Sequence, residues 1–424
     1  MTELPRGWAE STLGEIGRYL NGRGFKKSEW AEAGRPIIRI QNLTGSSQHI
    51  NYFDGEAEER YTARPSDVLV SWAATLGVFV WQGSEAVINQ HIFKVDSHVD
   101  HGFHRYLLLY VLDDLKSQTH GSGMVHITKT RFEATPVRVP PLGEQQRIVS
   151  AIEEHFSRID VAKGLLLNAR RQLDALRGLV IEAAFARDWP WTTLGEIAEI
   201  VGGVTKDANR QNNPSFVDVP YLRVANVQRG FLDLADVATI RVSEEKAAAL
   251  TLQPGDVLFN EGGDRDKLGR GWVWSGEVDR CIHQNHVFRA RLGEDFEPEF
   301  VSWHGNTFGR RWFEAHGRQT TNLASLNLTT LKSFPVPAPS RDEQRGTVAE
   351  IDRQLSITDA MHKAIDDALM RGEALRRSIL ARAFAGTLVP QDRADEPASI
   401  LLEQIDAERK SGPKAPLRRR KVPA

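Results

Sequence analysis

The hydrophobic positions follow two rhythms along the chain. In some stretches apolar residues form short runs, such as Pro36 to Ile40, Asp67 to Ser71 and Ala86 to Val95, that turn residues such as Asn21-Gly22 interrupt. In others they recur every three or four positions, as in amphipathic helices. The pattern predicts an α+β fold with two similar globular domains, each followed by a long helix: domain 1–142, helix 143–186, domain 187–338, helix 339–386 and a tail 387–424.

The first helical stretch has a heptad pattern. One apolar line is Ile152, Ile159, Leu166, Leu173 and Val180, and a second line is Ile148, Ala162, Ala169, Leu176 and Ala183. A helix of about 43 residues would be about 65 Å long, which is too long to pack inside one small domain. We therefore expect it to pair with another helix.

The second helical stretch supplies that partner. Its apolar line is Ile351, Met361, Ile365, Ala368, Leu375 and Ile379, and it is looser because Thr358 and Gly372 fall on it. Ser340 to Glu343 form a capping-box pattern at its start, and Gly386 and Pro390 follow its end. Because a globular domain lies between the helices in sequence, we expect an antiparallel coiled coil. The alternative is that each helix packs only on its own domain.

The order of motifs is duplicated. WAESTLGEI (Trp8 to Ile16) returns as WPWTTLGEI (Trp189 to Ile197), and NQHIF (Asn89 to Phe93) returns as QNHVF (Gln284 to Phe288). Between them, IIRIQN (Ile37 to Asn42) returns as YLRVAN (Tyr221 to Asn226). The sequence thus predicts a pseudo-two-fold internal repeat with two similar surfaces, which suits a target with two half-sites.

Composition narrows the class of protein. The formal net charge is −2, which argues against a uniformly basic nucleic-acid surface but leaves open a basic face or a basic partner. One cysteine excludes an internal disulfide framework. The sequence has no apolar run of membrane-spanning length and no secretory pattern at its start, so we expect a cytoplasmic protein.

No motif for catalysis stands out. Asn213 to Phe216 has only part of the Asn-Pro-Pro-aromatic loop of adenine methyltransferases, and a phosphate-binding loop with Lys-Ser/Thr is missing. His91 and His286 are equivalent in the repeat but have no further ligand at metal-binding spacing. The sequence therefore predicts a non-catalytic chain without a cofactor or metal of its own.

The two junctions carry the most informative motifs. PPLGEQQRI (Pro140 to Ile148) and PAPSRDEQ (Pro337 to Gln344) open the two helical stretches, and FAGTLVPQ (Phe384 to Gln391) closes the second. With the duplicated WxxxxLGEI they resemble the specificity (S) subunit of type I restriction–modification enzymes over nearly the whole chain. Two departures are Arg345 to Val348, where the first junction has Gln146 to Val149, and the longer loop Lys206 to Asp218.

The resemblance implies a division of labour. The globular parts would be target-recognition domains for double-stranded DNA, and the helices would be spacers. Two modification subunits would carry S-adenosylmethionine and the adenine-N6 methyltransferase, and restriction subunits would use ATP and Mg. Because the domains have diverged, the target would be a gapped, asymmetric, bipartite sequence. With modification subunits supplying much of the positive charge, we expect the chain alone to bind DNA weakly.

Base reading uses Arg, Lys, Asn and Gln on loops, because their donors and acceptors match the edges of bases. The candidates of the first domain are Arg23, Lys26, Lys27, Gln41, Asn89 and Gln90. Those of the second are Lys206, Arg210, Arg265, Lys267, Arg270, Gln284, Asn285, Arg318, Gln319 and Asn322. Positions that both repeats share, Arg39 with Arg223 and Asn42 with Asn226, are expected to hold the fold or touch phosphates.

Two other classes of protein remain open at this point. One is a DNA-independent coiled-coil scaffold for protein interaction, and the other is an enzyme with a site built across both repeats. After Pro390 the sequence is polar, with a short amphipathic piece at Ser399 to Ile405 and a basic end from Gly412.

Overall fold

The computed structural model describes residues 4–73, 75–117, 128–205, 213–263, 267–319 and 324–411, without the side chains of 116, 117, 263, 318, 319 and 324. These residues form two compact units. Unit 1 comprises Met1–Leu165 and Ala368–Ala424, and unit 2 comprises Leu166–Asp367. Each unit therefore contains one globular domain together with half of each long helix.

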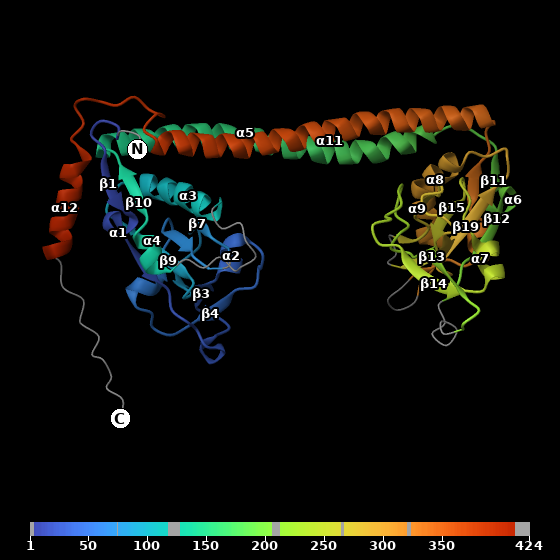
Figure 1. The fold of residues 1–424 in the computed structure, drawn as a ribbon, viewed down its shortest axis with the longest axis horizontal. Helices are drawn as coiled ribbons and strands as arrows, with labels where there is room; N and C mark the ends of the chain where they lie inside the picture. The colour runs from blue at the N-terminus through green and yellow to red at the C-terminus, as the bar shows by residue number, and fades with distance from the viewer. Residues whose placement is uncertain are drawn as a thin grey trace. The chain divides into compact units, whose positions relative to one another are not determined.

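The two long helices are α5 (Leu142–Ala184) and α11 (Arg341–Phe384), and they lie side by side within each unit (Figure 1). In unit 1, Lys163 Nζ lies 3.0 Å from Glu373 Oε1, and Arg376 pairs with Asp160. In unit 2, Arg170 pairs with Asp366 at 2.9 Å, Arg177 with Asp359, and His362 with Asp174 at 3.1 Å. In each unit the partners on α11 have lower residue numbers as the residue numbers on α5 rise, which confirms the antiparallel pairing.

The predicted first apolar line of α5, from Ile152 to Val180, is buried or half-buried as expected. On α11 the buried line includes Thr358 and Gly372, and Gly372 lies against Ile159. The second apolar line of α5, from Ile148 to Ala183, was also expected to be buried. This expectation was wrong at most of its positions, because a two-helix pair covers only a narrow stripe of each helix. The exposed members are Ala162, Leu176 and Ala183 of α5, and Met361 and Leu375 of α11.

The globular domain of unit 1 contains two four-stranded sheets, in the orders β2-β9-β6-β7 and β4-β3-β8-β5, and the antiparallel pair β1-β10. The strands are β1 Ala9–Thr12, β2 Gly17–Asn21, β3 Arg35–Ile38, β4 Asn51–Phe53, β5 Thr62–Ala63, β6 Val68–Ser71, β7 Gly77–Val80, β8 Ala86–Ile88, β9 Ile92–Ser97 and β10 Pro136–Val139. The short helices are α1 Leu13–Ile16, α2 Ile40–Thr44, α3 His101–Ser117 and α4 Lys129–Glu133, with 3-10 turns at Lys27–Glu29 and Glu59–Tyr61.

The domain of unit 2 repeats this plan with its own additions. Its sheets have the orders β12-β19-β15-β17, β14-β13-β18 and β16-β21-β20, and β11 pairs with β22. The strands are β11 Trp191–Thr193, β12 Ala198–Gly202, β13 Val217–Leu222, β14 Ala238–Val242, β15 Val257–Asn260, β16 Gly262–Gly263, β17 Gly271–Val273, β18 Ile282–His283, β19 Val287–Leu292, β20 Arg318–Gln319, β21 Ala324–Ser325 and β22 Pro335–Pro337. The helices are α6 Leu194–Ile197, α7 Glu244–Leu250, α8 Pro298–Asn306, α9 Phe308–His316 and α10 Leu328–Lys332.

One parallel strand pair recurs in both domains. β3 pairs with β8 through Ile37 and Val87, and β13 pairs with β18 through Tyr221 and Ile282. The predicted run from Ala86 to Val95 is two strands, β8 and β9, with a turn at Asn89 to His91 between them. The parallel pairing therefore brings the residues after β3 and the residues of this turn to the same end of the domain.

Each domain joins its long helix through the glutamine of the duplicated Glu-Gln motif. The buried Gln145 accepts from the backbone N–H of Asp100 at 2.9 Å and donates to the carbonyl of Pro140 at 2.9 Å. The buried Gln344 accepts from the N–H of Glu297 at 2.9 Å and donates to the carbonyls of Asp295 and Pro339 at 3.0 Å. The motif recurs because one amide can satisfy backbone groups of both helix and domain.

The duplicated Leu-Gly-Glu-Ile segment is a capped helical turn, as expected of a structural element. Glu15 accepts from the N–H of Thr12 at 2.9 Å, while Leu13 and Ile16 are fully buried. The copy in unit 2 has the same cap, with Glu196 accepting from the N–H of Thr193 at 3.1 Å.

The segment after α11 packs on unit 1. Arg147 on α5 forms two hydrogen bonds to Asp395, the shorter 2.6 Å long, and the N–H of Ala398 donates to the carbonyl of Gly7. The amphipathic piece expected at Ser399 to Ile405 lies within α12 (Ala398–Ser411), which buries Ile405. The basic end, residues 412–424, lies outside the described residues. In the described part of the chain, we find no helix with both the length and the apolar character that a membrane crossing requires.

Candidate nucleic-acid interface

In unit 1, loops at the carboxyl ends of β2, β3, β6 and β8 meet. The N–H of Arg23 donates to the carbonyl of Ile88 at 3.0 Å, and the N–H of Asn89 donates to that of Ile38 at 3.0 Å. Gly22 permits this approach, because a Cβ there would collide with the Ile88 carbonyl. We call this surface face 1; it comprises Arg23 to Lys27, Gln41, Trp72 and Asn89 to His91.

Face 1 brings the six candidates of the first domain to one end of the domain. Lys26, Lys27, Gln41 and Gln90 are exposed, and Asn89 is half-buried. Arg23 is already engaged, because it pairs with Glu29 at 2.8 Å and stacks 4.0 Å above the ring centre of Phe25. The groups most open to a ligand are therefore two lysines and three side-chain amides.

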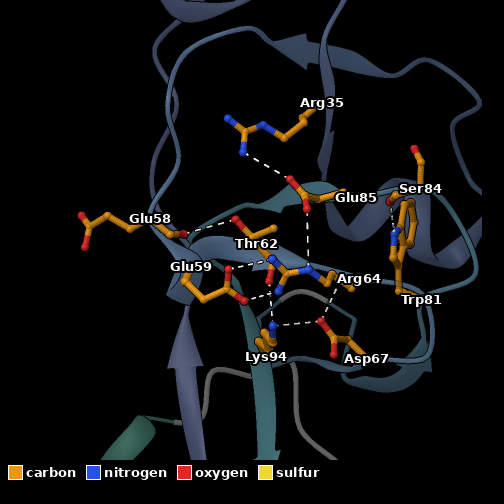
Figure 2. A network of polar contacts seen from close by, with 10 residues as sticks. All are labelled: Arg35, Glu58, Glu59, Thr62, Arg64, Asp67, Trp81, Ser84, Glu85 and Lys94. Carbon is orange, nitrogen blue, oxygen red and sulfur yellow. Dashed lines mark hydrogen bonds and ion pairs between the residues drawn. The ribbon is translucent and has the colours of Figure 1, made fainter.

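The amino ends of β3, β6 and β8 have a different character. Figure 2 shows a network in which Arg64 contacts Glu59 and Glu85, and Arg35 contacts Glu85 at 3.4 Å. Lys94 lies 3.0 Å from Asp67 and donates to the carbonyl of Thr62 at 2.9 Å. These cations are paired with carboxylates, so this end offers less positive charge to a phosphate backbone than face 1 does.

Unit 2 builds an equivalent surface. The N–H of Val204 donates to the carbonyl of His283 at 2.8 Å, and the N–H of Gln284 donates to the carbonyl of Leu222 at 2.9 Å. The N–H of Glu261 donates to the carbonyl of His286 at 2.9 Å. Lys267 and Arg270 adjoin it, since the carbonyl of Arg270 accepts from the N–H of Asn260, the last residue of β15. We call this surface face 2; it comprises Val204, Glu261, Lys267, Arg270 and Gln284 to His286.

The described residues include part of the candidate set of the second domain. Lys206, Arg210, Arg265 and Asn322 lie outside the described residues. Arg318 and Gln319 have a described backbone in β20, which pairs with β21, but not described side chains. Of the ten candidates in this domain, the described side chains that the fold gathers on face 2 are those of Lys267, Arg270, Gln284 and Asn285.

The two shared asparagines have structural roles. Asn42 accepts from the N–H of Arg39 at 3.0 Å and donates to the carbonyl of His49 at 2.9 Å. Asn226 accepts from the N–H of Arg223 at 2.8 Å and donates to the carbonyls of Asp233 and Asp236 at 2.9 Å. Both amides hold the turn that follows the parallel strand, so the equivalence of the repeats extends to single hydrogen bonds.

Comparison with known proteins gives one consistent family. Residues 5–169 match the model of the type I restriction modification DNA specificity domain. The chain is 25% identical to the type I restriction enzyme EcoBI specificity subunit of Escherichia coli, over 95% of this chain and 92% of that one. It is 23% identical to the EcoKI specificity subunit of Escherichia coli strain K12, over 96% of both chains.

Solved structures agree on the fold. A chain from a structure on complex assembly and conformational transition of the type I R-M system superposes with a TM-score of 0.67 at 17% identity, over 91% of this chain and all of that one. The HsdS subunit from Thermoanaerobacter tengcongensis superposes with a TM-score of 0.56 at 19% identity, over 91% and 98%. Over nearly its whole length the chain is therefore similar to the specificity subunits of type I restriction–modification enzymes.

The two faces carry different side chains at positions where their backbones are equivalent. Trp72 follows β6 and its N–H donates to the carbonyl of His91, just as Glu261 follows β15 and donates to His286. Trp72 packs against the His91 ring at a centroid distance of 5.6 Å, whereas Glu261 Oε2 lies 2.6 Å from His286 Nδ1. Trp72 and Glu261 were not among the residues predicted from the sequence; the alignment of His91 with His286 is the signal that points to them.

A second histidine lies directly below face 2 and is structural. His283 is fully buried, and its Nδ1 lies 2.6 Å from the carbonyl of Val287. Burial lowers the pKa of His283 to about 4, so its ring is neutral at physiological pH. Among the described residues, three or more His, Cys, Asp or Glu side chains nowhere form a group that could hold a metal ion.

Proposed function

We propose that this chain is the DNA sequence-recognition subunit of a type I restriction–modification complex. It binds a gapped, asymmetric, bipartite target in double-stranded DNA, with face 1 reading one half-site and face 2 the other. The observation that carries the proposal is the pair of equivalent faces, which share a backbone frame but differ in the side chains on it. Shared frames suit common docking on the DNA backbone, and unlike side chains suit unlike base sequences.

The chemistry is assigned to other subunits. The chain would be non-catalytic and would position two adenine-N6 methyltransferase subunits, which bind S-adenosylmethionine. Restriction subunits would use ATP and Mg for translocation and cleavage. This division is supported by the family of the chain and by its sequence, in which no methyltransferase or phosphate-binding motif is complete.

The two-helix pair offers a docking surface for each modification subunit. In unit 1 the exposed apolar residues include Leu165 and Leu375, and in unit 2 they include Leu176, Leu179 and Met361. By their heptad positions, these apolar residues lie on one side of the buried line of each helix. The interhelical ion pairs lie on the other side. Leu375 is 52% exposed and its repeat equivalent Leu176 is 47% exposed, so each unit presents a similar apolar strip. Similar strips would favour two copies of one partner.

The direct test of the function is the pattern of methylation in cells. The cognate modification subunit is expressed with or without this chain, and genomic N6-methyladenine is mapped by single-molecule sequencing. We expect methylation at one gapped motif only when the chain is present. Methylation that is independent of the chain, or a chain that binds its partners with no effect on methylation, would favour the scaffold alternative.

The docking surface is tested by placing a charge on each strip. Leu375→Asp and Leu176→Asp should each release one modification subunit, with the loss seen by native mass spectrometry. Arg377→Asp, on an exposed side of α11, is the matched control and should leave the stoichiometry unchanged. If both aspartate variants keep two modification subunits, the docking surface lies elsewhere.

A further inference from the structure

A histidine and a glutamate form a close pair on face 2. His286 Nδ1 lies 2.6 Å from Glu261 Oε2, and the N–H of Glu261 donates to the carbonyl of His286 at 2.9 Å. The His286 side chain is 53% exposed, and that of Glu261 is 26% exposed. The backbone bond fixes the two residues beside each other, so the imidazole stands on the surface with a carboxylate behind it.

The pair determines what the ring presents to solvent. An ionised carboxylate only accepts hydrogen bonds, so Nδ1 of His286 carries the proton. In the neutral ring Nε2 then keeps its lone pair and acts as an acceptor. Asn285 Nδ2, a donor, lies 3.4 Å from Nε2, which fits this assignment and is long enough for a ligand to displace it.

The equivalent histidine of face 1 is arranged differently. The ring of His91 packs against Trp72, its Nδ1 is buried, and Gln90 Nε2 lies 3.2 Å from its Nε2. One backbone position therefore carries an imidazole packed against a tryptophan in the first domain and an imidazole held by a carboxylate in the second. A residue that only supported the fold would not need a different partner in each copy.

We propose that His286 is a specificity-determining residue of the second domain, and that Glu261 is its positioning residue. The Nε2 atom of His286 accepts a hydrogen bond from an exocyclic amino group in the major groove, which is N6 of adenine or N4 of cytosine. This inference rests on the proposed function, since it names the reader of one base pair in the half-site of face 2.

The first experiment locates that base pair. The motif methylated in cells is compared for the wild-type chain and for His286→Ala. We expect the variant to tolerate any base at one position of one half-site, while the other half-site stays intact. Weaker methylation at an unchanged motif would instead assign His286 to phosphate contact and overturn the inference.

The second experiment identifies the group that is read. The purified complex with its modification subunits is titrated with duplexes that carry, at the located position, the natural base or an analogue without the amino group. The wild-type complex should bind the analogue about ten- to a hundred-fold more weakly, as for one lost base contact. The His286→Ala complex should bind the two duplexes equally. An amino-group deletion that costs both complexes the same affinity would overturn the inference.

The third experiment separates positioning from folding. Glu261→Ala should relax the same base position as His286→Ala, but less, because the ring loses its partner and stays in place. Glu261→Gln keeps an acceptor for Nδ1–H and should restore discrimination. Glu245→Ala, an exposed change on α7 of the same domain, is the matched control. If Glu261→Gln relaxes the motif as much as Glu261→Ala, Glu261 does not act through His286.

The outcomes distinguish this inference from the proposed function. If the wild-type chain directs no methylation motif, the proposed function fails before any variant is made. If the wild-type chain directs a gapped motif and His286→Ala leaves it unchanged, the function stands and the assignment of His286 is wrong.

Discussion

The junctions and the faces of this chain have diverged to different degrees. At the junctions, Gln145 and Gln344 make equivalent contacts to the backbone of helix and domain. At the faces, Trp72 and Glu261 occupy equivalent backbone positions with unlike chemistry. The duplicated chain has kept the side chains that satisfy buried backbone groups, and it has changed those on the faces that we propose contact DNA.

The ion pairs between the long helices α5 and α11 are also repeated in the two units, but less strictly. Arg376 with Asp160 in unit 1 corresponds to Arg177 with Asp359 in unit 2, and Lys163 with Glu373 corresponds to His362 with Asp174. The second correspondence keeps a similar distance, 3.0 and 3.1 Å, but exchanges lysine for histidine and glutamate for aspartate. Surface ion pairs therefore tolerate substitutions of residue type that the buried glutamines have not undergone.

Acid should distinguish the two domains most strongly. Burial lowers the pKa of His283 and His304 in unit 2 to about 4, and that of His104 in unit 1 to about 3. Below pH 6.5 these histidines bind protons in the unfolded chain but stay neutral in the folded chain. Their contribution to stability is therefore complete above pH 6.5 and declines as the pH falls. The loss is about 1.4 kcal/mol per pH unit for each histidine.

Burial also lowers the pKa of His98 in unit 1, so unit 2 should lose more stability than unit 1 between pH 6.5 and pH 5, but less than twice as much. Hydrogen exchange of the two units at several pH values measures this. His304→Gln retains a donor for the carbonyl of Pro335, which lies 3.0 Å from Nε2, and should reduce the pH slope of unit 2 by one proton. An unchanged slope would show that His304 takes up no proton on unfolding.

Replacing a junction glutamine should be the next largest effect. Gln344→Leu leaves one buried N–H and two carbonyls without their partner, and should lower the free energy of unfolding of unit 2 by about 3 kcal/mol. Gln145→Leu removes two such bonds from unit 1 and should cost somewhat less. Urea denaturation measures both. Equal losses from Gln344→Leu and from the exposed change Gln41→Leu would contradict a special role for the junction.

The interhelical ion pairs should give the smallest effect. Exposed pairs contribute about 0–1 kcal/mol, so removing Arg376 with Asp160, or Arg177 with Asp359, should give a small and similar coupling energy. Double-mutant cycles at low and high salt measure it. A coupling of several kcal/mol in one unit alone would show that the two halves of the coiled coil are not equivalent.

The sequence predicts the repeat, the long helices and their pairing, because heptad spacing and motif order depend on local pattern alone. It misplaces Leu176, Met361 and Leu375, because heptad counting assigns every apolar residue to the buried stripe, whereas two helices cover only part of it. Once the partner helix is known, the exposed Leu176, Met361 and Leu375 become candidates for contact with another protein.

The candidate site is predictable only in part. Asn89, Gln90, Gln284 and Asn285 follow from residue type and turn position, and the structure gathers them on the two faces. The contacts of Trp72 and Glu261 depend on pairing between strands that are distant in sequence, so the alignment of His91 with His286 in the repeat is the one signal that hints at them. The candidates were chosen among Arg, Lys, Asn and Gln, so a choice by these residue types passes over tryptophan and glutamate.

The central claim is that each face reads its own half-site. It is tested most directly by mapping N6-methyladenine in cells that carry the modification subunit with the wild-type chain, with Asn89→Ala plus Gln90→Ala, or with Gln284→Ala plus Asn285→Ala. We predict that the first pair relaxes one half of the gapped motif and the second pair relaxes only the other half. Variants that alter both halves together, or neither, would contradict the account.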